Sequence, residues 1–314
     1  MRPTLASSLC GSIVLLLVTA LPARSAIVVA SEFFHGEMEH YFVTAFAAEE
    51  AALEAGDAWA RTATQYRVHD APGPGLVPVC RFFTASFAPL SSHFFTADAT
   101  ECEIVKSNPR WTSEGIAFFV KSAAADGSCA AGWAPVYRLY NDGLTGAPNH
   151  RYTPRRAERA EFLARGWRPE GAGPLGVAFC VPVAPDDATE RLRSLAESSW
   201  SFGWQAGMLG TIVTFDFGPV TLSFDPDLPY EVQAARFEGS AQGTAQWDPF
   251  LGKLVVMGWS SITPQHRLVF DVSTAGEVTG CAYVATEPAG VRFPPPPYVQ
   301  STYHACQPLQ GWRN

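Results

Sequence analysis

Short apolar runs separated by polar turns recur three times in the first two-thirds of the chain. Each copy opens with an apolar run, at residues 28–34, 79–83 and 136–140, and a His–aromatic–Thr step follows after a turn. A Glu stands five residues after each Thr, with an apolar residue one helical turn further on. A last apolar run lies around Tyr66, Phe118 or Phe179. This pattern predicts three units, each ordered strand, strand, short helix, strand.

The positions that recur form one signature. They are His40, Thr44, Glu49 and Trp59 in the first copy; His93, Thr96, Glu101, Trp111, Glu114 and Gly115 in the second; and His150, Thr153, Glu158, Trp167, Glu170 and Gly171 in the third. The first copy has Thr62 and Ala63 in place of Glu–Gly. One unit is too small to bury its own apolar face, so we expect a pseudo-threefold arrangement in which like strands meet near an axis.

The helix boundaries are also predicted. Thr96 and Thr153 are suited to cap the first N–H groups of their helices, and the Glu residues favour the positive helix end. Gly56, Asn108 and Gly166 are expected to end the three helices.

The pattern changes after residue 183. The repeat domain is expected at 26–183, with units at about 28–70, 77–122 and 134–182. A linker at 184–188 and a second domain at 189–314 should follow, and the second domain should begin with a short helix at 189–198. Strand-like runs follow at 200–204, 211–217, 230–237, 253–259, 267–272 and 278–286. Close spacing without helices predicts an antiparallel meander, either a barrel or a sandwich, with a weak likeness to lipocalin barrels. The fold class is therefore mainly β with short helices.

The N-terminus resembles a secretory signal peptide. Residues 1–25 combine Arg2, an apolar stretch and small residues before the expected cleavage site. Removing them takes two Arg from a balance of 22 Lys+Arg against 30 Asp+Glu, which leaves 20 − 30 = −10. So acidic a chain has little electrostatic reason to bind nucleic acid or an anionic membrane, and no later segment is long and apolar enough to insert into one. We expect a secreted or periplasmic protein of undetermined oligomeric state.

An even number of cysteines remains after cleavage, which in an exported chain predicts disulfides. The repeat register favours pairing neighbours in sequence: Cys80 with Cys102, Cys129 with Cys180, and Cys281 with Cys306. Their spacing does not match a zinc site, so no metal is expected there.

Several segments together resemble an uncharacterised bacterial repeat domain: "PVCRFF", "SHFFTADATEC", "WTSEGIAFFV", "PVYRLYN", "NHRYT" and "GWRPEG". That domain is found in secreted proteins and, in some of them, beside cell-wall lytic enzymes. The resemblance covers about residues 28–182 and leaves the C-terminal third unassigned. It implies a surface or extracellular role.

The signature allows two interpretations. Three histidines around an axis could bind a metal, and His with Glu could act as acid and base. A residue that recurs in every unit more commonly performs a structural task in each, and we favour that interpretation for the whole signature. The recurring Trp side chains are expected in the core, whereas Trp133, Trp204 and Trp259 do not recur and are freer to contact a ligand.

The sequence contains no nucleophile motif and no phosphate-binding loop. We therefore expect a non-catalytic protein without a cofactor, which binds a glycan or cell-wall component through the repeat domain. Three alternatives stay open: a structural or protein-interaction module, a lipocalin-like carrier of an apolar ligand, and an unrecognised hydrolase.

Overall fold

The computed structural model describes residues 25–184 except residue 145. In the C-terminal third it describes the backbone of 198–206, 209–217, 234–237, 242–259, 266–272, 277–286, 302–303 and 306–313, with side chains for 247–256, 267–271, 277–283 and 306–309. Residues 1–24 of the expected signal peptide, linker residues 185–188 and positions 189–197 of the expected helix lie outside the described residues. The domain boundaries therefore stay a prediction.

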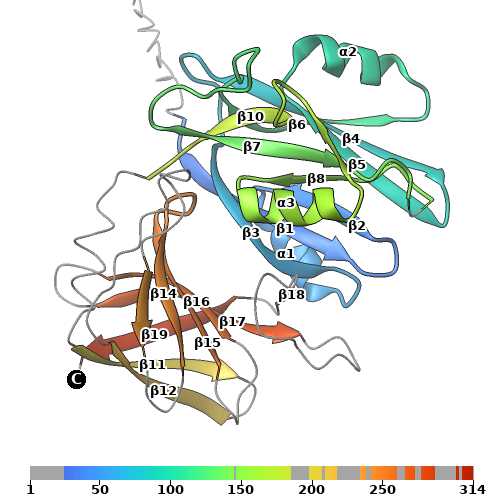
Figure 1. Cartoon of the computed structure of the whole chain (residues 1–314). Helices are drawn as coiled ribbons and strands as arrows, with labels where there is room; N and C mark the ends of the chain where they lie inside the picture. The colour runs from blue at the N-terminus through green and yellow to red at the C-terminus, as the bar shows by residue number, and fades with distance from the viewer. Residues whose placement is uncertain are drawn as a thin grey trace, which may run out of the picture.

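Three units follow one another along the repeat domain (Figure 1). The first two have the predicted order strand, strand, helix, strand, and the third has an additional short strand between its helix and its last strand. Unit one comprises β1 (Ile27–His35), β2 (His40–Thr44), α1 (Ala47–Ala55) and β3 (Ala60–His69). Unit two comprises β4 (Val77–Phe87), β5 (Leu90–Thr96), α2 (Ala99–Ser107) and β6 (Thr112–Val120). Unit three comprises β7 (Trp133–Tyr140), β8 (His150–Thr153), α3 (Arg156–Ala164), β9 (Arg168–Glu170) and β10 (Val177–Pro182).

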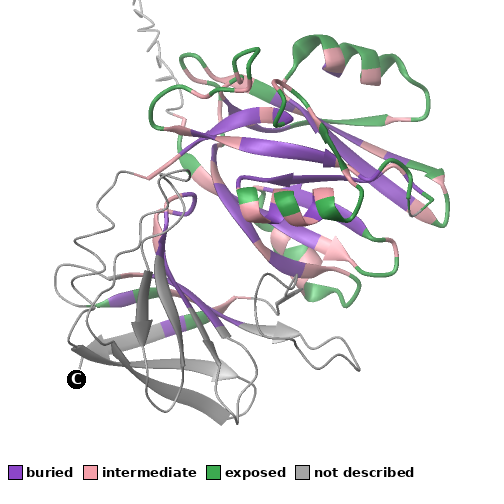
Figure 2. Cartoon of the chain, in the orientation of Figure 1, coloured by how far each residue is buried: buried purple, intermediate pink, exposed green. Residues whose placement is uncertain are grey.

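Like strands of the three units meet in the interior of the domain. β2, β5 and β8 contact one another pairwise, and the central strands are largely buried (Figure 2). Three aromatic residues occupy equivalent positions, because each is paired with a residue on the first strand of its own unit: Tyr66 with Ala30, Phe118 with Val79, and Phe179 with Val136. The ring centroids of Phe118 and Phe179 are 5.9 Å apart, and those of Tyr66 and Phe179 are 6.3 Å apart. Each unit thus completes the core of the other two.

The expectation that threonine caps the helices is wrong. The N-cap residues are Phe46, Asp98 and Arg155, each two residues after the signature Thr, and Asp98 alone makes a side-chain cap bond, with the N–H of Glu101. The Thr hydroxyl instead accepts the N–H two residues on, which forms a local turn before the helix starts. Gly56 and Asn108 are C-caps as predicted, and Gly166, with φ +91°, follows the C-cap of α3.

The C-terminal third is a barrel. Its strands are β11 (Ser198–Ala206), β12 (Leu209–Phe217), β13 (Ala234–Phe237), β14 (Gln242–Asp248), β15 (Lys253–Trp259), β16 (His266–Val272), β17 (Val278–Thr286) and β19 (Gln307–Arg313). The short strand β18 (Thr302–Tyr303) lies outside the ring and pairs with β17 and with β3 of unit one. From β11 to β17 each strand pairs antiparallel with the next, and β19 pairs with both β17 and β11. The ring of strands is therefore closed.

Three disulfides join the predicted neighbours, Cys80 to Cys102, Cys129 to Cys180, and Cys281 to Cys306. The first lies within unit two, the second spans unit three, and the third lies within the barrel. Among the described residues, no helix has the length and apolar character needed to cross a membrane. The three disulfides are compatible with an extracellular location.

Candidate functional site

The signature Thr and Glu of each unit contact each other directly. The Thr hydroxyl donates to the Glu carboxylate at 2.5 Å in unit one, 2.5 Å in unit two and 2.6 Å in unit three. Glu158, in unit three, is buried, and its Oε2 atom also accepts from Thr64 of unit one at 2.9 Å. The Glu residues therefore do more than favour a helix end, because they hold the helix start against the strand that carries the Thr.

An arginine from the next unit reaches across to each of the first two Glu residues. Arg81 of unit two donates to both carboxylate oxygens of Glu49 in unit one, each at 2.9 Å. Arg138 of unit three does the same to Glu101 of unit two, at 2.8 and 2.9 Å. The guanidinium groups also lie over Phe42 and Phe94, 5.3 and 4.9 Å from the ring centroids. Two parallel hydrogen bonds of this kind constrain the relative orientation of the two side chains and also strengthen their interaction.

The third junction, between units one and three, has the opposite polarity. Glu32 stands where Arg81 and Arg138 stand, because it pairs with Val43 as they pair with Phe95 and Tyr152. Arg151 stands at the position of Phe94. It donates to Glu32 from Nε at 3.1 Å and from one terminal nitrogen at 2.9 Å, and that nitrogen lies 3.4 Å from Glu158.

Burial and charge act against each other on the carboxylates of this third junction. Burial raises the pKa of Glu32 above its ordinary value, although the charge and hydrogen bonds of Arg151 oppose the shift. Burial also acts to raise the pKa of Glu158, but Arg151 and Arg155 outweigh it and hold that pKa below its ordinary value. Glu158 is therefore ionised at neutral pH.

The three histidines do not all make the same hydrogen bond. His93 Nε2 lies 3.2 Å from Glu114 and His150 Nε2 lies 3.3 Å from Glu170, each within its own unit. His40 has Thr62 in place of such a Glu, and its Nδ1 atom lies 3.0 Å from Ser91 Oγ of unit two. His93 Nδ1 completes a chain to His40 Nε2 at 2.9 Å. The carboxylates beside histidine thus belong to the Glu–Gly step.

Burial keeps these imidazoles neutral. It lowers the pKa of His40, helped by the nearby His93 and His35, to about 3. Burial also lowers the pKa of His93 and of His150 more than their Glu partners raise it. Among the described residues, no group of three or more His, Cys, Asp or Glu side chains is placed to hold a metal ion. The structural interpretation of the signature stays a prediction, and these contacts favour it.

The recurring tryptophans pack against core clusters of their own regions. Trp59 packs on the central cluster, Trp111 on the cluster around Phe94, and Trp167 on the cluster around Phe162. The side chains of Trp204 and Trp259 lie outside the described residues. Trp133 is half-buried at the start of β7, so it is the non-recurring candidate whose surroundings are described.

Trp133 lies in a mixed aromatic and polar surface. The His69 ring stacks on it with centroids 5.9 Å apart and planes 21° apart. Lys121 Nζ lies 4.5 Å from the Trp133 ring centroid, and Ser25 Oγ lies 2.8 Å from His69 Nδ1. All four side chains are half-buried, so their polar atoms and part of the indole reach the surface together.

A family model described as "Domain of unknown function (DUF5648)" matches residues 30–177, hereafter the DUF5648 domain. The expected likeness to an uncharacterised domain is thereby confirmed, and the barrel lies outside the match. No curated protein and no solved structure matched the chain. These comparisons therefore assign no ligand and no reaction to the DUF5648 domain.

The arginines of the DUF5648 domain escaped the sequence interpretation, although a signal for two of them was present. Arg81 and Arg138 occupy the same place in "PVCRFF" and "PVYRLYN", four residues into each segment's strand pattern. Each also lies beside the Glu of its own Glu–Gly step, Arg81 Nε at 3.0 Å from Glu114 and Arg138 Nε at 3.4 Å from Glu170. Their bidentate Glu partners lie in the preceding unit, and a pattern within one unit cannot indicate a contact between units.

Proposed function

We propose that the chain is an exported, non-catalytic binding protein and that its DUF5648 domain binds a glycan or another component of the cell surface. The signature side chains are engaged with one another in the interior, which favours a rigid scaffold over a reaction centre. Export is supported by the signal-like N-terminus and by the three disulfides, which are typical of oxidising compartments. The secreted or periplasmic space would bring the domain into contact with wall material.

The observation that carries this proposal is the surface around Trp133. An indole that is partly open presents an apolar face on which the C–H groups of a sugar ring can stack. Lys121 and His69 flank it with groups that can hydrogen-bond hydroxyl or carboxylate oxygens. An amphipathic ligand with polar oxygens around an apolar ring face is the chemical class that fits.

Binding of the purified mature chain to insoluble peptidoglycan and to a panel of soluble polysaccharides tests the proposal. We expect Trp133→Ala to weaken binding at least tenfold with little change in the melting temperature, and Trp133→Phe to retain part of it. Trp167→Phe serves as the control, since that side chain packs on Phe162 and Leu139 rather than beside Lys121. Binding that Trp133→Ala leaves unchanged excludes this surface. If no glycan binds and a protein partner does, the interaction-module alternative is correct, and turnover of a polysaccharide would favour the hydrolase.

A second candidate function rests on the barrel. On β15, β16 and β17 one face carries Leu254, Val256, Leu268, Phe270 and Ala282, each exposed by no more than 1 %. A closed ring of about eight strands has an interior that side chains fill or that holds one small ligand. A lipocalin-like carrier would therefore bind an apolar fluorescent probe stoichiometrically and enhance its fluorescence. A Phe270→Leu variant should change the affinity for the probe. The absence of saturable probe binding would exclude this candidate.

A further inference from the structure

The helix start of unit three departs from the other two at the residue that faces the barrel. The N-cap positions hold Phe46, Asp98 and Arg155. A cation at the positive end of a helix is unfavourable, and Arg155 provides no side-chain cap. Its guanidinium instead forms an ion pair with Asp248 of the barrel, whose side chain is completely buried. The unfavourable residue in the helix is thus explained by a contact outside the repeat domain.

That ion pair extends into the junction with reversed polarity. Arg155 Nε lies 3.8 Å from Glu158, and Glu158 lies 3.4 Å from Arg151, which in turn is 2.9 Å from Glu32. Acidic and basic side chains therefore alternate from Asp248 to Glu32. The departures at Glu32, Arg151 and Arg155 all belong to the one junction that the barrel contacts through this chain of charges.

Asp248 also shapes the turn that carries it. Its Oδ1 atom accepts the N–H groups of Phe250 at 3.0 Å and Leu251 at 3.2 Å. Gly252 follows with φ +66°, and a Cβ there would meet the Cβ of Ala184 at 3.1 Å. The turn between β14 and β15 is consequently held in one conformation and approaches the repeat domain closely.

The turn inserts into the central core of the repeat domain. Phe250 is 1 % exposed and belongs to the same cluster as Tyr66, Phe118 and Phe179. Its carbonyl accepts the N–H of Arg67 at 3.0 Å, and the carbonyl of Pro249 accepts that of Ala184 at 2.8 Å. An aromatic ring from the barrel thereby fills space in a core built by the three units.

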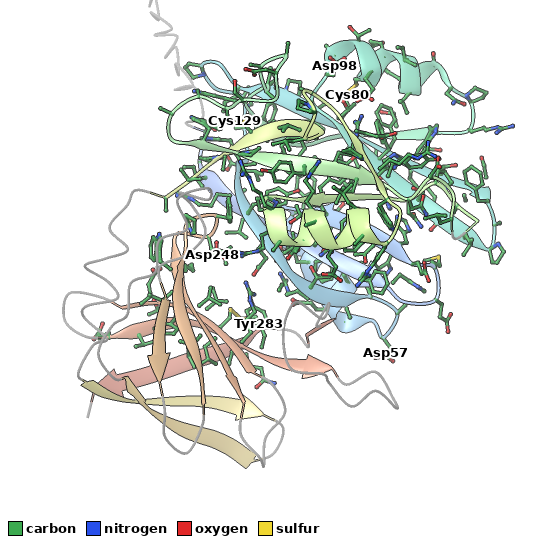
Figure 3. The ribbon with its side chains drawn as sticks, viewed as in Figure 1. Asp57, Cys80, Asp98, Cys129, Asp248 and Tyr283 are labelled. Carbon is green, nitrogen blue, oxygen red and sulfur yellow. A yellow bond between two sulfur atoms is a disulfide. The ribbon has the colours of Figure 1, made fainter. Side chains whose placement is uncertain are left out.

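The outer face of the barrel adds a second contact beside the turn. Val255, Val269 and Tyr283 pack with Val29 and Ala63 of unit one. Arg267, which is 2 % exposed, donates to Gln65 Oε1 at 2.9 Å and to the carbonyl of Ala63 at 3.3 Å. Figure 3 shows Asp248 and Tyr283 on the side of the barrel that faces the repeat domain.

We propose that the junction between units one and three is a docking site for a β-turn with the sequence Asp–Pro–Phe, and that this turn holds the barrel on the DUF5648 domain independently of the connecting segment. None of the three disulfides joins the two parts. Cleavage of the linker predicted at 184–188 should therefore yield two fragments that stay together through non-covalent contacts alone.

The test uses the full chain with a specific protease site inserted into residues 185–188. The folded protein is cleaved under non-reducing conditions and passed over a size-exclusion column at about 1 μM. We expect the wild-type fragments to elute as one complex. Asp248→Asn should raise the dissociation constant at least tenfold, because it removes the buried carboxylate that pairs with the half-buried guanidinium of Arg155 and leaves Glu158, at 3.8 Å, as its neighbouring carboxylate. Phe250→Ser should separate the fragments.

Asp98→Asn is the matched control, because it makes the same substitution on the far side of the repeat domain from the barrel (Figure 3). Asp98 is the N-cap residue of α2, as Arg155 is of α3. The cleaved control should elute like the wild type. Arg155→Gln removes the same ion pair from the side of the repeat domain and leaves the hydrogen bonds of the turn to Asp248 intact, so it should weaken the complex at least as much as Asp248→Asn, which separates docking from misfolding of the turn. Wild-type fragments that separate at this concentration, or equal behaviour of Asp248→Asn and Asp98→Asn, would overturn the proposal.

Discussion

The reversed junction between units one and three can be converted to the pattern of the other two by exchanging a pair of residues. Glu32→Arg places a guanidinium where Arg81 and Arg138 lie, and Arg151→Phe places a ring where Phe94 lies. The new arginine could then reach Glu158 and lie over the new ring, as Arg138 reaches Glu101 and lies over Phe94. If the three junctions are variants of one design, the double variant should be more stable than either single variant.

The structure sets the size of each effect. Arg151→Phe removes the hydrogen-bonded cation from Glu32, whose side chain is fully buried, and so leaves a carboxylate with only the Thr62 hydroxyl. Breaking one side of a buried ion pair costs about 3–5 kcal/mol. Glu32→Arg should cost a similar amount, because it places two cations beside the single carboxylate of Glu158. The double variant should recover a coupling energy on the order of 2 kcal/mol.

Urea unfolding of the four proteins at pH 7.5, with disulfides intact, measures this coupling. The exposed pair Glu161 and Arg165 supplies the control, since exchanging its charges should give a coupling within about 0.5 kcal/mol. Two results would refute the reasoning: an Arg151→Phe variant that loses less than about 1 kcal/mol, or a double variant that loses the full sum of both single changes.

Three further predictions follow from buried groups and from one strained turn. The folded pKa of His40 is about 3, below the ordinary unfolded value of about 6.5, so its neutral form contributes stability that is present above pH 6.5 and is lost as the pH falls towards 3, by up to about 1.4 kcal/mol per pH unit. His40→Gln should flatten the curve of unfolding free energy against pH over this window. An unchanged slope would contradict the assignment. Thr153→Val should cost about 1–3 kcal/mol in urea unfolding through loss of the bond to Glu158, whereas Thr153→Ser should cost less than half of that. Gly252→Ala should lower the melting temperature by several degrees because φ +66° disfavours a side chain, and an unchanged melt would show that the turn adjusts.

The sequence was sufficient for what repeats within one unit. Three strand–strand–helix–strand units, the ends of the helices and the disulfide partners all follow from spacing, because local turns and caps determine them. Four strands escaped. Two of them, β9 (Arg168–Glu170) and β18 (Thr302–Tyr303), are very short. Of the two longer ones, β14 (Gln242–Asp248) is largely polar and β19 (Gln307–Arg313) contains Pro308 and Gly311, so neither has strong strand propensity. They form because a closing ring supplies hydrogen-bond partners on both sides.

Contacts between units and between parts of the chain were beyond the sequence pattern. The Thr side chain looked like a helix cap because it precedes an acidic, helix-like stretch, yet the two residues between Thr and helix form a turn that moves the cap to Asp98 or Arg155. The pairing of Arg81 with Glu49 joins different units, and Asp248 reaches Arg155 across 93 positions. Such contacts are decided by packing in three dimensions, which a spacing rule does not contain.

The disulfides have a consequence for the order in which the protein is made. Each bond joins cysteines that follow each other directly in the order of cysteines along the chain, so a chain entering an oxidising compartment N-terminus first would present each of these cysteines together with its correct partner before the next pair arrives. Oxidation during translocation would then need little correction by an isomerase. Unit one, which has no cysteine, would be the part that must wait, since its Glu49 and Glu32 obtain their arginines only when units two and three have emerged.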